Sequence, residues 1–175
     1  MPILDSGDRT EYASGAVRDM KEGKGRCDLL PLKEAAEFLD WVQRGDMKLA
    51  GSALDQFIQF VRYINEGECK PEFLYSAVYR FACANNWDVP TMLIELSKHF
   101  EEGAIKYKER NWEKGILAHS FVDSSIRHYL KWLRGDQDEP HDRAVCWNWF
   151  CLLWTLRNRP ECNDLLTMEE LQNGN

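Results

Sequence analysis

The chain has 175 residues, of which 44% are hydrophobic, 29% charged and 12% aromatic. These values fit one globular domain with a sizeable core and exclude a fibrous or wholly disordered chain. The formal net charge is −7, so we expect no binding to long nucleic acid. No stretch is apolar enough to span a membrane, and residues 1–10 lack the pattern of a secretion signal. The sequence therefore predicts a cytoplasmic protein without membrane contacts.

The first 31 residues show no sustained periodicity and are predicted to form an irregular N-terminal arm. Within this arm, residues 23–26 read Gly-Lys-Gly-Arg. Glycines allow the backbone to approach an anion, and two cations can neutralise a phosphate. The loop lacks the Walker pattern, so it predicts only that Lys24 and Arg26 contact a small phosphate group.

From Pro31 onward, apolar residues recur with helical spacing. This periodicity predicts an all-α fold, with a single domain of about six helices over residues 32–166 and a separate tail at 167–175. The expected helices include a long one from about residue 90 to Tyr107 and a tryptophan-rich one that ends near Arg157. No stretch of useful length alternates as a strand does.

Two predicted helices carry carboxylates together with histidines. The helix from residue 90 has Glu95, His99, Glu102 and Lys106 at steps of four, three and four, which aligns them along one side. The last helix is expected to open with Asp138, Glu139, His141 and Asp142. Together these groups predict a divalent-metal site. A solvent-exposed face and ordinary helix-capping carboxylates are the alternatives.

The segments between these helices contain further candidates. Arg127 stands four residues after Asp123, which is also the spacing of a routine surface ion pair. Asn111 and Trp112 lie in a polar loop, where they can contact a nucleotide base, although a buried loop anchor is the commoner role for such a tryptophan.

Three segments resemble a family found mainly in phage and prophage genomes. They are SGAVRDMKEGKGRCDLLPL (14–32), HFEEGAIKYKERNWEKG (99–115) and DSSIRHYLKWLRGDQDEPHDRAVCWN (123–148). The family is named for the N-terminal region of dATP/dGTP diphosphohydrolases. The resemblance implies a distant relation to the all-α, MazG-like nucleoside triphosphate pyrophosphatases, in which E-x-x-E and E-x-x-D helices hold magnesium. Glu139 and Asp142 match the second motif, whereas His99 replaces the first glutamate of the motif that ends at Glu102.

The resemblance implies metal-dependent hydrolysis of (deoxy)nucleoside triphosphates to monophosphate and pyrophosphate in phage nucleotide metabolism, within the host cytoplasm. The expected catalytic residues are Glu102, His141 and Asp142. The expected ligands of Mg²⁺ or Mn²⁺ are His99, Glu102, Asp138, Glu139 and Asp142. The expected substrate contacts are Lys24, Arg26, Lys106, Tyr107, Asn111, Trp112, Arg127, His128 and Lys131.

The alternative hypothesis is a non-catalytic phage protein that binds a nucleotide and so sequesters it or a host defence signal. It needs the basic loop and the aromatic contact, but no complete metal cluster. In both cases a nucleotide is the expected partner, and we expect the chain to form a homo-oligomer.

Overall fold

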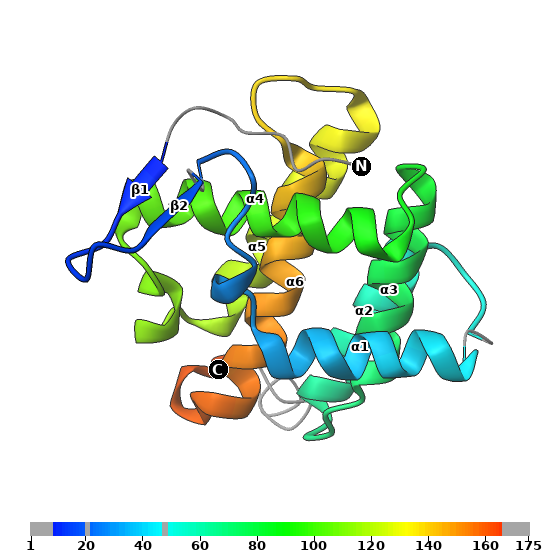
Figure 1. Ribbon diagram of the computed structural model, residues 1–175. Helices are drawn as coiled ribbons and strands as arrows, with labels where there is room; N and C mark the ends of the chain where they lie inside the picture. Colours follow the sequence, from blue (N-terminus) through cyan, green and yellow to red (C-terminus); the bar gives the residue numbers. More distant parts are fainter. Residues whose placement is uncertain (1–8, 20–21, 47–48, 166–175) are drawn as a thin grey trace.

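The computed structural model describes residues 9–19, 22–46 and 49–165 and is built almost wholly from helices. The described residues form six α-helices, which are labelled in Figure 1: Leu32–Arg44 (α1), Ala53–Asn65 (α2), Pro71–Ala84 (α3), Val89–Tyr107 (α4), Ala118–Arg134 (α5) and His141–Asn158 (α6). Short 3-10 turns cover Cys27–Leu29 (η1), Asn111–Lys114 (η2) and Pro160–Cys162 (η3). The predicted all-α fold is confirmed.

A small antiparallel sheet in the arm was not predicted. It pairs β1 (Arg9–Glu11) with β2 (Val17–Asp19), with Thr10 opposite Arg18. Each strand has three residues, which is too few for a period-two pattern to stand out from a loop.

Local sequence signals explain where several helices begin and end. Ser52 caps α2 through a reciprocal pair of hydrogen bonds with Asp55. The Asp88 side chain accepts a 2.8 Å hydrogen bond from the Thr91 backbone N–H at the start of α4. Gly135 ends α5 with a φ of 83°, a left-handed conformation that favours glycine. The α5–α6 loop therefore starts at a defined residue.

The core of the molecule is organised around α6. Figure 1 shows α6 passing through the middle of the structure, with α4 and α1 crossing it, and both helices contact it. Trp149 of α6 stacks on Phe57 of α2 at 5.1 Å and packs edge-on against Phe81 of α3 at 5.7 Å. Phe150 packs edge-on against Phe38 of α1. Because α6 is held on several sides, its first residue is a fixed point for a functional site.

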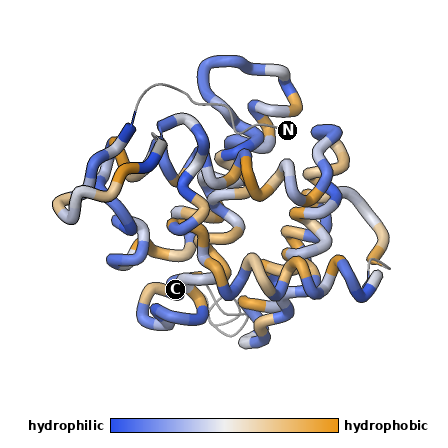
Figure 2. Tube along the Cα trace, viewed as in Figure 1, coloured by the Kyte–Doolittle hydropathy of each residue, from blue (hydrophilic) through white to orange (hydrophobic). Residues whose placement is uncertain are grey.

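The loop between α5 and α6 is the hydrophilic end of this bundle. The two helices pack against each other, and Figure 2 colours their connection mainly as hydrophilic. The loop therefore places polar side chains beside the start of α6, near the neighbouring α4. In the described ranges, no helix is both long enough and apolar enough to cross a bilayer.

Candidate active site

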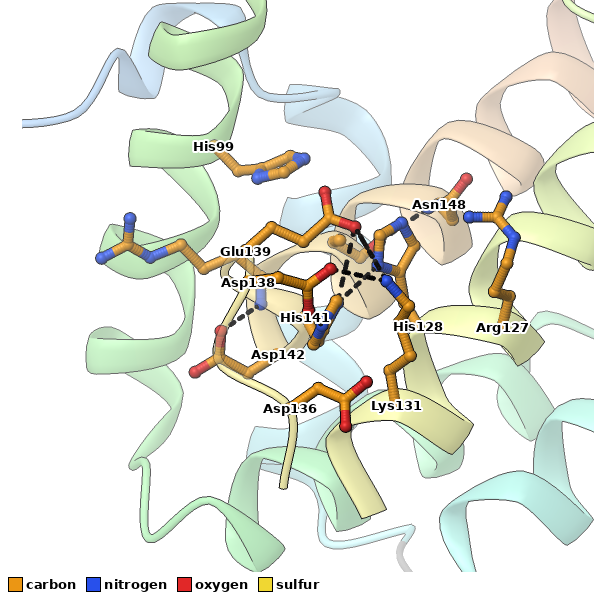
Figure 3. A network of polar contacts seen from close by, with 12 residues as sticks. His99, Arg127, His128, Lys131, Asp136, Asp138, Glu139, His141, Asp142 and Asn148 are labelled. Atoms are coloured by element: carbon orange, nitrogen blue, oxygen red, sulfur yellow. Dashed lines mark hydrogen bonds and ion pairs between the residues drawn. The ribbon is translucent and has the colours of Figure 1, made fainter. Parts of the chain in front are cut away.

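Two histidines face each other where α5 and α6 meet. The Nδ1 atoms of His128 on α5 and His141, the first residue of α6, lie 2.9 Å apart, and both side chains are buried. The Glu139 carboxylate lies 3.7 Å from Nδ1 of His128 and 3.8 Å from Nδ1 of His141. Burial lowers the pKa of His128, which favours its neutral form. Three atoms of the kind that bind metals therefore converge, as Figure 3 shows.

Asp138 orients His141 from the opposite side of the ring. Its Oδ1 atom lies 2.8 Å from Nε2 of His141, and its Oδ2 atom accepts a 2.7 Å hydrogen bond from Lys131. The hydrogen bond from Lys131, followed by the contact with His141, holds the pKa of Asp138 well below its usual range. Because Nε2 of His141 faces this carboxylate, Nε2 carries the ring proton. The lone pair of Nδ1 is then directed toward His128 and Glu139.

His99 of α4 lies beside the same cluster. Figure 3 shows its ring next to Glu139. Burial, with further contributions from the positive charges of His128 and Arg143, lowers the pKa of His99 to about 4, so the ring is neutral at pH 7. Its Nδ1 atom is buried and has no hydrogen-bond partner. His99 is therefore a polar group with an unused hydrogen-bonding atom, close to the histidine pair.

Arg143 of α6 forms ion pairs with two carboxylates of α4. It lies 2.6 Å from Glu95 and 3.1 Å from Glu102. Glu95 also accepts a 2.6 Å hydrogen bond from Lys98. Burial alone would raise the pKa of Glu95, but the hydrogen bond from Lys98 and the charge of Arg143 outweigh that effect and lower it. These contacts form a polar seam between the two helices.

The structure does not bring all the expected metal ligands together. Glu102 pairs with Arg143 and lies 3.7 Å from Nδ1 of His99, while Asp142 accepts a hydrogen bond from the backbone N–H of Arg143. Over the described residues, two groups have ligand atoms within 4.8 Å of one another, and neither includes His99, Glu102 or Asp142. They are His128–Glu139–His141 and Asp136–Asp138–His141.

His99 also lines a cavity of about 420 Å³. Its walls are mainly apolar and aromatic, and four of the residues expected to form the site contribute a ring or an amide. The lining includes His99, Phe100, Tyr107, Asn111, Trp112 and Trp147. Its size is within the range of small-molecule pockets, which is about 300–1,000 Å³. His99 therefore borders both the cavity and the histidine cluster.

Trp112 is at once a buried loop anchor and part of this cavity wall. Its ring packs edge-on against Trp154 at 4.8 Å and against Phe100 at 5.6 Å. Its Nε1 atom is buried and has no hydrogen-bond partner. Packing therefore fixes the Trp112 ring as a loop anchor, and the same ring forms part of the cavity wall.

The glycine loop of the arm already holds an anion from within the protein. The backbone N–H groups of Gly23 and Gly25 donate hydrogen bonds of 3.2 and 2.9 Å to the buried carboxylate of Glu101 on α4. Gly25 has a φ of 86° and approaches α4 so closely that a Cβ atom would collide with Ser97 Oγ. The amides that were expected to approach a phosphate are therefore used to attach the arm to α4.

The two cations of this loop differ in their contacts. Arg26 forms ion pairs of 2.7 Å with both Asp28 and Glu109. The hydrogen bond from Arg26 to Asp28, followed by that to Glu109, raises the pKa of the guanidinium. Lys24 is exposed to solvent. Of the two expected phosphate contacts, Arg26 thus serves mainly to attach the arm.

The remaining expected substrate contacts lie at different distances from the cluster. Lys106 is exposed, with its ammonium 4.9 Å from the ring centre of Tyr107. Arg127 forms a 3.4 Å ion pair with Asp123, as its spacing allowed. Lys131 is part of the cluster through Asp138. The structure therefore groups Lys131, but not Arg127, with the histidine pair.

Three residues of this region were not singled out from the sequence. Arg143 was overlooked because an arginine one turn into a helix has no distinctive signal. Glu101 is adjacent to the more conspicuous Glu102, and only the fold shows that it binds the arm. Trp147 belongs to the tryptophan-rich helix, and nothing in the sequence separates it from its neighbours; in the structure it is partly exposed and lines the cavity, whereas Trp149 is buried.

Comparison with known families gives one match. The model of the family described as "dATP/dGTP diphosphohydrolase, N-terminal" matches residues 76–165. This range includes α4, α5, α6, the histidine cluster and the cavity walls formed by η2, but not the glycine loop. No curated protein and no solved structure matches the chain. Because the match covers just over half of its residues, the chain belongs to the dATP/dGTP diphosphohydrolase N-terminal family.

Proposed function

We propose that this protein hydrolyses deoxynucleoside triphosphates to the monophosphate and pyrophosphate, with a divalent metal ion, in the nucleotide metabolism of a phage. The observation that carries the proposal is the position of His99, which lines an aromatic cavity and also lies beside the histidine–carboxylate cluster. A nucleotide has two corresponding parts, an aromatic base that could bind in the cavity and phosphates that could bind at the cluster.

The cavity fits the base end of such a ligand. Phe100, Trp147 and Trp112 offer aromatic surfaces, and flat rings pack favourably against them. The unpaired Nε1 of Trp112 and Nδ1 of His99 are buried polar atoms that gain a hydrogen bond if a base supplies the partner. Asn111 adds an amide that can both donate and accept. These groups support recognition of a base by its edges.

The cluster fits the phosphate end. Lys131 provides a cation whose pKa is raised by its hydrogen bond to Asp138, so it stays charged at neutral pH. A bound divalent cation neutralises phosphate charge and makes its coordinated water a better nucleophile. His128, His141 and Glu139 are the side chains placed to hold one. Because the net charge of −7 repels a triphosphate, binding requires local positive charge, which Lys131 and the bound metal ion would supply.

In the proposed reaction, the oxygen of a water molecule forms a bond to the α-phosphorus, and the bond from that phosphorus to the bridging oxygen breaks. Pyrophosphate leaves with the bridging oxygen, and the water loses a proton. Glu102 is our candidate for the proton acceptor, because it is a half-exposed carboxylate next to His99. Arg143 holds it in place through the 3.1 Å ion pair.

The test is incubation of the protein with a panel of deoxynucleoside and ribonucleoside triphosphates and with each of several divalent metals, followed by anion-exchange chromatography. We expect a monophosphate and pyrophosphate in equal amounts. Asn111→Ala should raise KM more than it lowers kcat, whereas Asp123→Asn, on the outer face of α5, should change neither. Release of orthophosphate and a diphosphate would contradict the proposed bond cleavage.

Nucleotide sequestration without turnover is the second candidate, and one observation favours it. Arg143 engages Glu102 through its side chain and Asp142 through its backbone N–H, so these carboxylates do not join the cluster. In this case, equilibrium dialysis should recover the nucleotide unchanged and tightly bound, and Asn111→Ala should weaken the binding. The same chromatogram therefore separates the two candidates.

A further inference from the structure

We propose that His128, His141 and Glu139 form a two-histidine, one-carboxylate centre for a divalent transition-metal ion, such as Zn²⁺, Co²⁺ or Ni²⁺, in preference to Mg²⁺. The inference concerns the ion of the proposed active site and rests on the proposed function for its chemical role. It differs from the site expected from the sequence on His99, Glu102, Asp138, Glu139 and Asp142, because His99, Glu102 and Asp142 belong to neither group of converging ligand atoms in the described residues.

The spacing of the three ligand atoms suits one ion. The distances among Nδ1 of His128, Nδ1 of His141 and Oε1 of Glu139 are 2.9, 3.7 and 3.8 Å. Metal–nitrogen bonds of about 2.0–2.1 Å in a tetrahedral site place neighbouring ligand atoms about 3.3 Å apart. The observed distances lie on both sides of this value, so side-chain rotations that move the ligand atoms by a few tenths of an ångström would give the spacing that the ion needs. Further coordination positions stay open for water and phosphate oxygens.

The second ring nitrogen of His141 has the partner that a metal-binding histidine usually has. Its Nε2 atom contacts Asp138 Oδ1 at 2.8 Å, and Lys131 fixes that carboxylate from the other side at 2.7 Å. A carboxylate that accepts the Nε2 proton fixes the tautomer and turns the Nδ1 lone pair toward the ion. Without an ion, His128 and His141 share one hydrogen bond between two Nδ1 atoms, which requires a proton on His128.

The charge of the cluster also favours a cation. Asp138 and Glu139 contribute two negative charges, Lys131 contributes one positive charge, and Asp136 is paired with Arg134 at 2.7 Å. The three charged side chains Asp138, Glu139 and Lys131 thus sum to a net negative charge. A divalent ion reverses this charge, and the incoming triphosphate can balance it.

The chemistry of the donor set selects among metals. Imidazole nitrogen is a ligand of Zn²⁺, Ni²⁺, Cu²⁺ and Fe²⁺, whereas Mg²⁺ prefers oxygen ligands in octahedral geometry and retains its water. Two of the three donors in this cluster are imidazoles. The ligand set therefore ranks the later first-row metals above magnesium.

The experiment measures metal binding without nucleotide on the full chain freed of metal by a chelator. Each ion, Zn²⁺, Co²⁺, Ni²⁺, Mn²⁺ or Mg²⁺, is titrated by calorimetry, and the Co²⁺ complex is examined by visible absorption. We expect one ion per chain, an intense Co²⁺ spectrum of low coordination number, and Mg²⁺ affinity at least about tenfold below that of Zn²⁺. Magnesium binding as tight as zinc binding would overturn the inference.

Matched variants identify the ligands. Glu139→Gln changes an exposed loop side chain, so the protein should fold, and zinc affinity should fall by more than the roughly 10- to 100-fold loss that follows removal of an outer-shell partner. Asp138→Asn should reduce affinity less, and it should change the Co²⁺ spectrum by freeing the His141 ring. Asp136→Asn is the control, because Asp136 belongs to the other cluster of potential ligands. Loss of binding in Asp136→Asn but not in Glu139→Gln would assign the ion to that other group and overturn the proposal.

The results also separate this inference from the proposed function. If zinc binds through Glu139 but no nucleotide is hydrolysed, the metal-centre proposal holds and the hydrolase proposal is wrong. If nucleotide hydrolysis needs Mg²⁺, Glu102 and Asp142 but is unaffected by Glu139→Gln, the hydrolase proposal holds and the metal-centre proposal is wrong.

Discussion

The glycine loop of the arm and the loop between α5 and α6 are both short, polar and charged, yet the fold uses them differently. In the arm, the amides of Gly23 and Gly25 bind Glu101, and Arg26 is paired with Asp28 and Glu109. In the α5–α6 loop, Asp138 and Glu139 are directed toward two buried histidines. Residue type therefore identifies groups that can bind an anion or a cation, but the partners present in the folded chain decide whether a ligand is still needed.

Of these two regions, the one around the α5–α6 loop should respond most strongly to acid, because His99 of α4 lies beside its carboxylates. Its pKa is about 4 in the fold against an ordinary value of 6.5, so the unfolded chain binds the proton more readily. The free energy of unfolding should fall by at most about 3 kcal/mol as the pH drops from 6.5 to 4. Urea unfolding at several pH values measures this slope, and His99→Gln should remove that part of it. An unchanged slope in the variant would show that His99 is solvated in the folded chain.

The attachment of the arm is tested next by two glycine substitutions. Gly25→Ala should destabilise the protein by about 2–3 kcal/mol, because its Cβ would collide with Ser97 and its φ is positive. Gly23→Ala has the same kind of backbone but no atom within 4 Å of its Cβ, so about 1 kcal/mol is expected. Thermal unfolding of both variants gives the difference. Equal losses would mean that the close approach to α4 is absent in solution.

Adjacent glutamates provide the third comparison. Glu101→Gln should cost about 1 kcal/mol, since it weakens charge-assisted hydrogen bonds from two backbone amides. Glu102→Gln should cost no more than about 0.5 kcal/mol, because its ion pair with Arg143 is exposed on the glutamate side. Hydrogen exchange of the Gly23 and Gly25 amides should rise in the first variant alone. Faster exchange in the second would contradict the assignment of Glu101 as the anchor.

The smallest effects are expected at the two cations of the arm. Arg26→Ala should lower stability by about 0.5–1 kcal/mol through loss of two ion pairs, and Lys24→Ala by less than about 0.5 kcal/mol. Nucleotide affinity of the Lys24→Ala protein should change by no more than about threefold, as for a screened surface charge. A tenfold loss would instead identify this loop as a phosphate site.

The helices were predictable because their signals are local. The signals that predict a helix, such as Pro31 near its start, Gly135 at its end and the regular spacing of apolar residues, involve only residues that are close in the sequence. The observed α1, α4 and α6 begin or end within a few residues of the expected positions. The three-residue strands of the arm gave no such signal. Local periodicity thus determines elements of several turns but not short pairings between distant residues.

The site was only partly accessible from the sequence, for a different reason. The stripe of Glu95, His99 and Glu102 indicated a face of α4, but it did not reveal that Arg143 would reach two of its carboxylates across the helix interface. Nor did the sequence indicate that His128 and His141 would meet, since they are thirteen residues apart on different helices. Such contacts depend on how α4, α5 and α6 pack.

The position of His99 has a thermodynamic consequence. A ligand in the aromatic cavity and an ion at the histidine cluster would both alter the surroundings of this one ring. If the cavity ligand raises the ion affinity by some factor, the ion must raise the ligand affinity by the same factor. Binding in the cavity and binding at the histidine cluster would then be cooperative. A base analogue without phosphates would change the ion affinity only through its effect on His99.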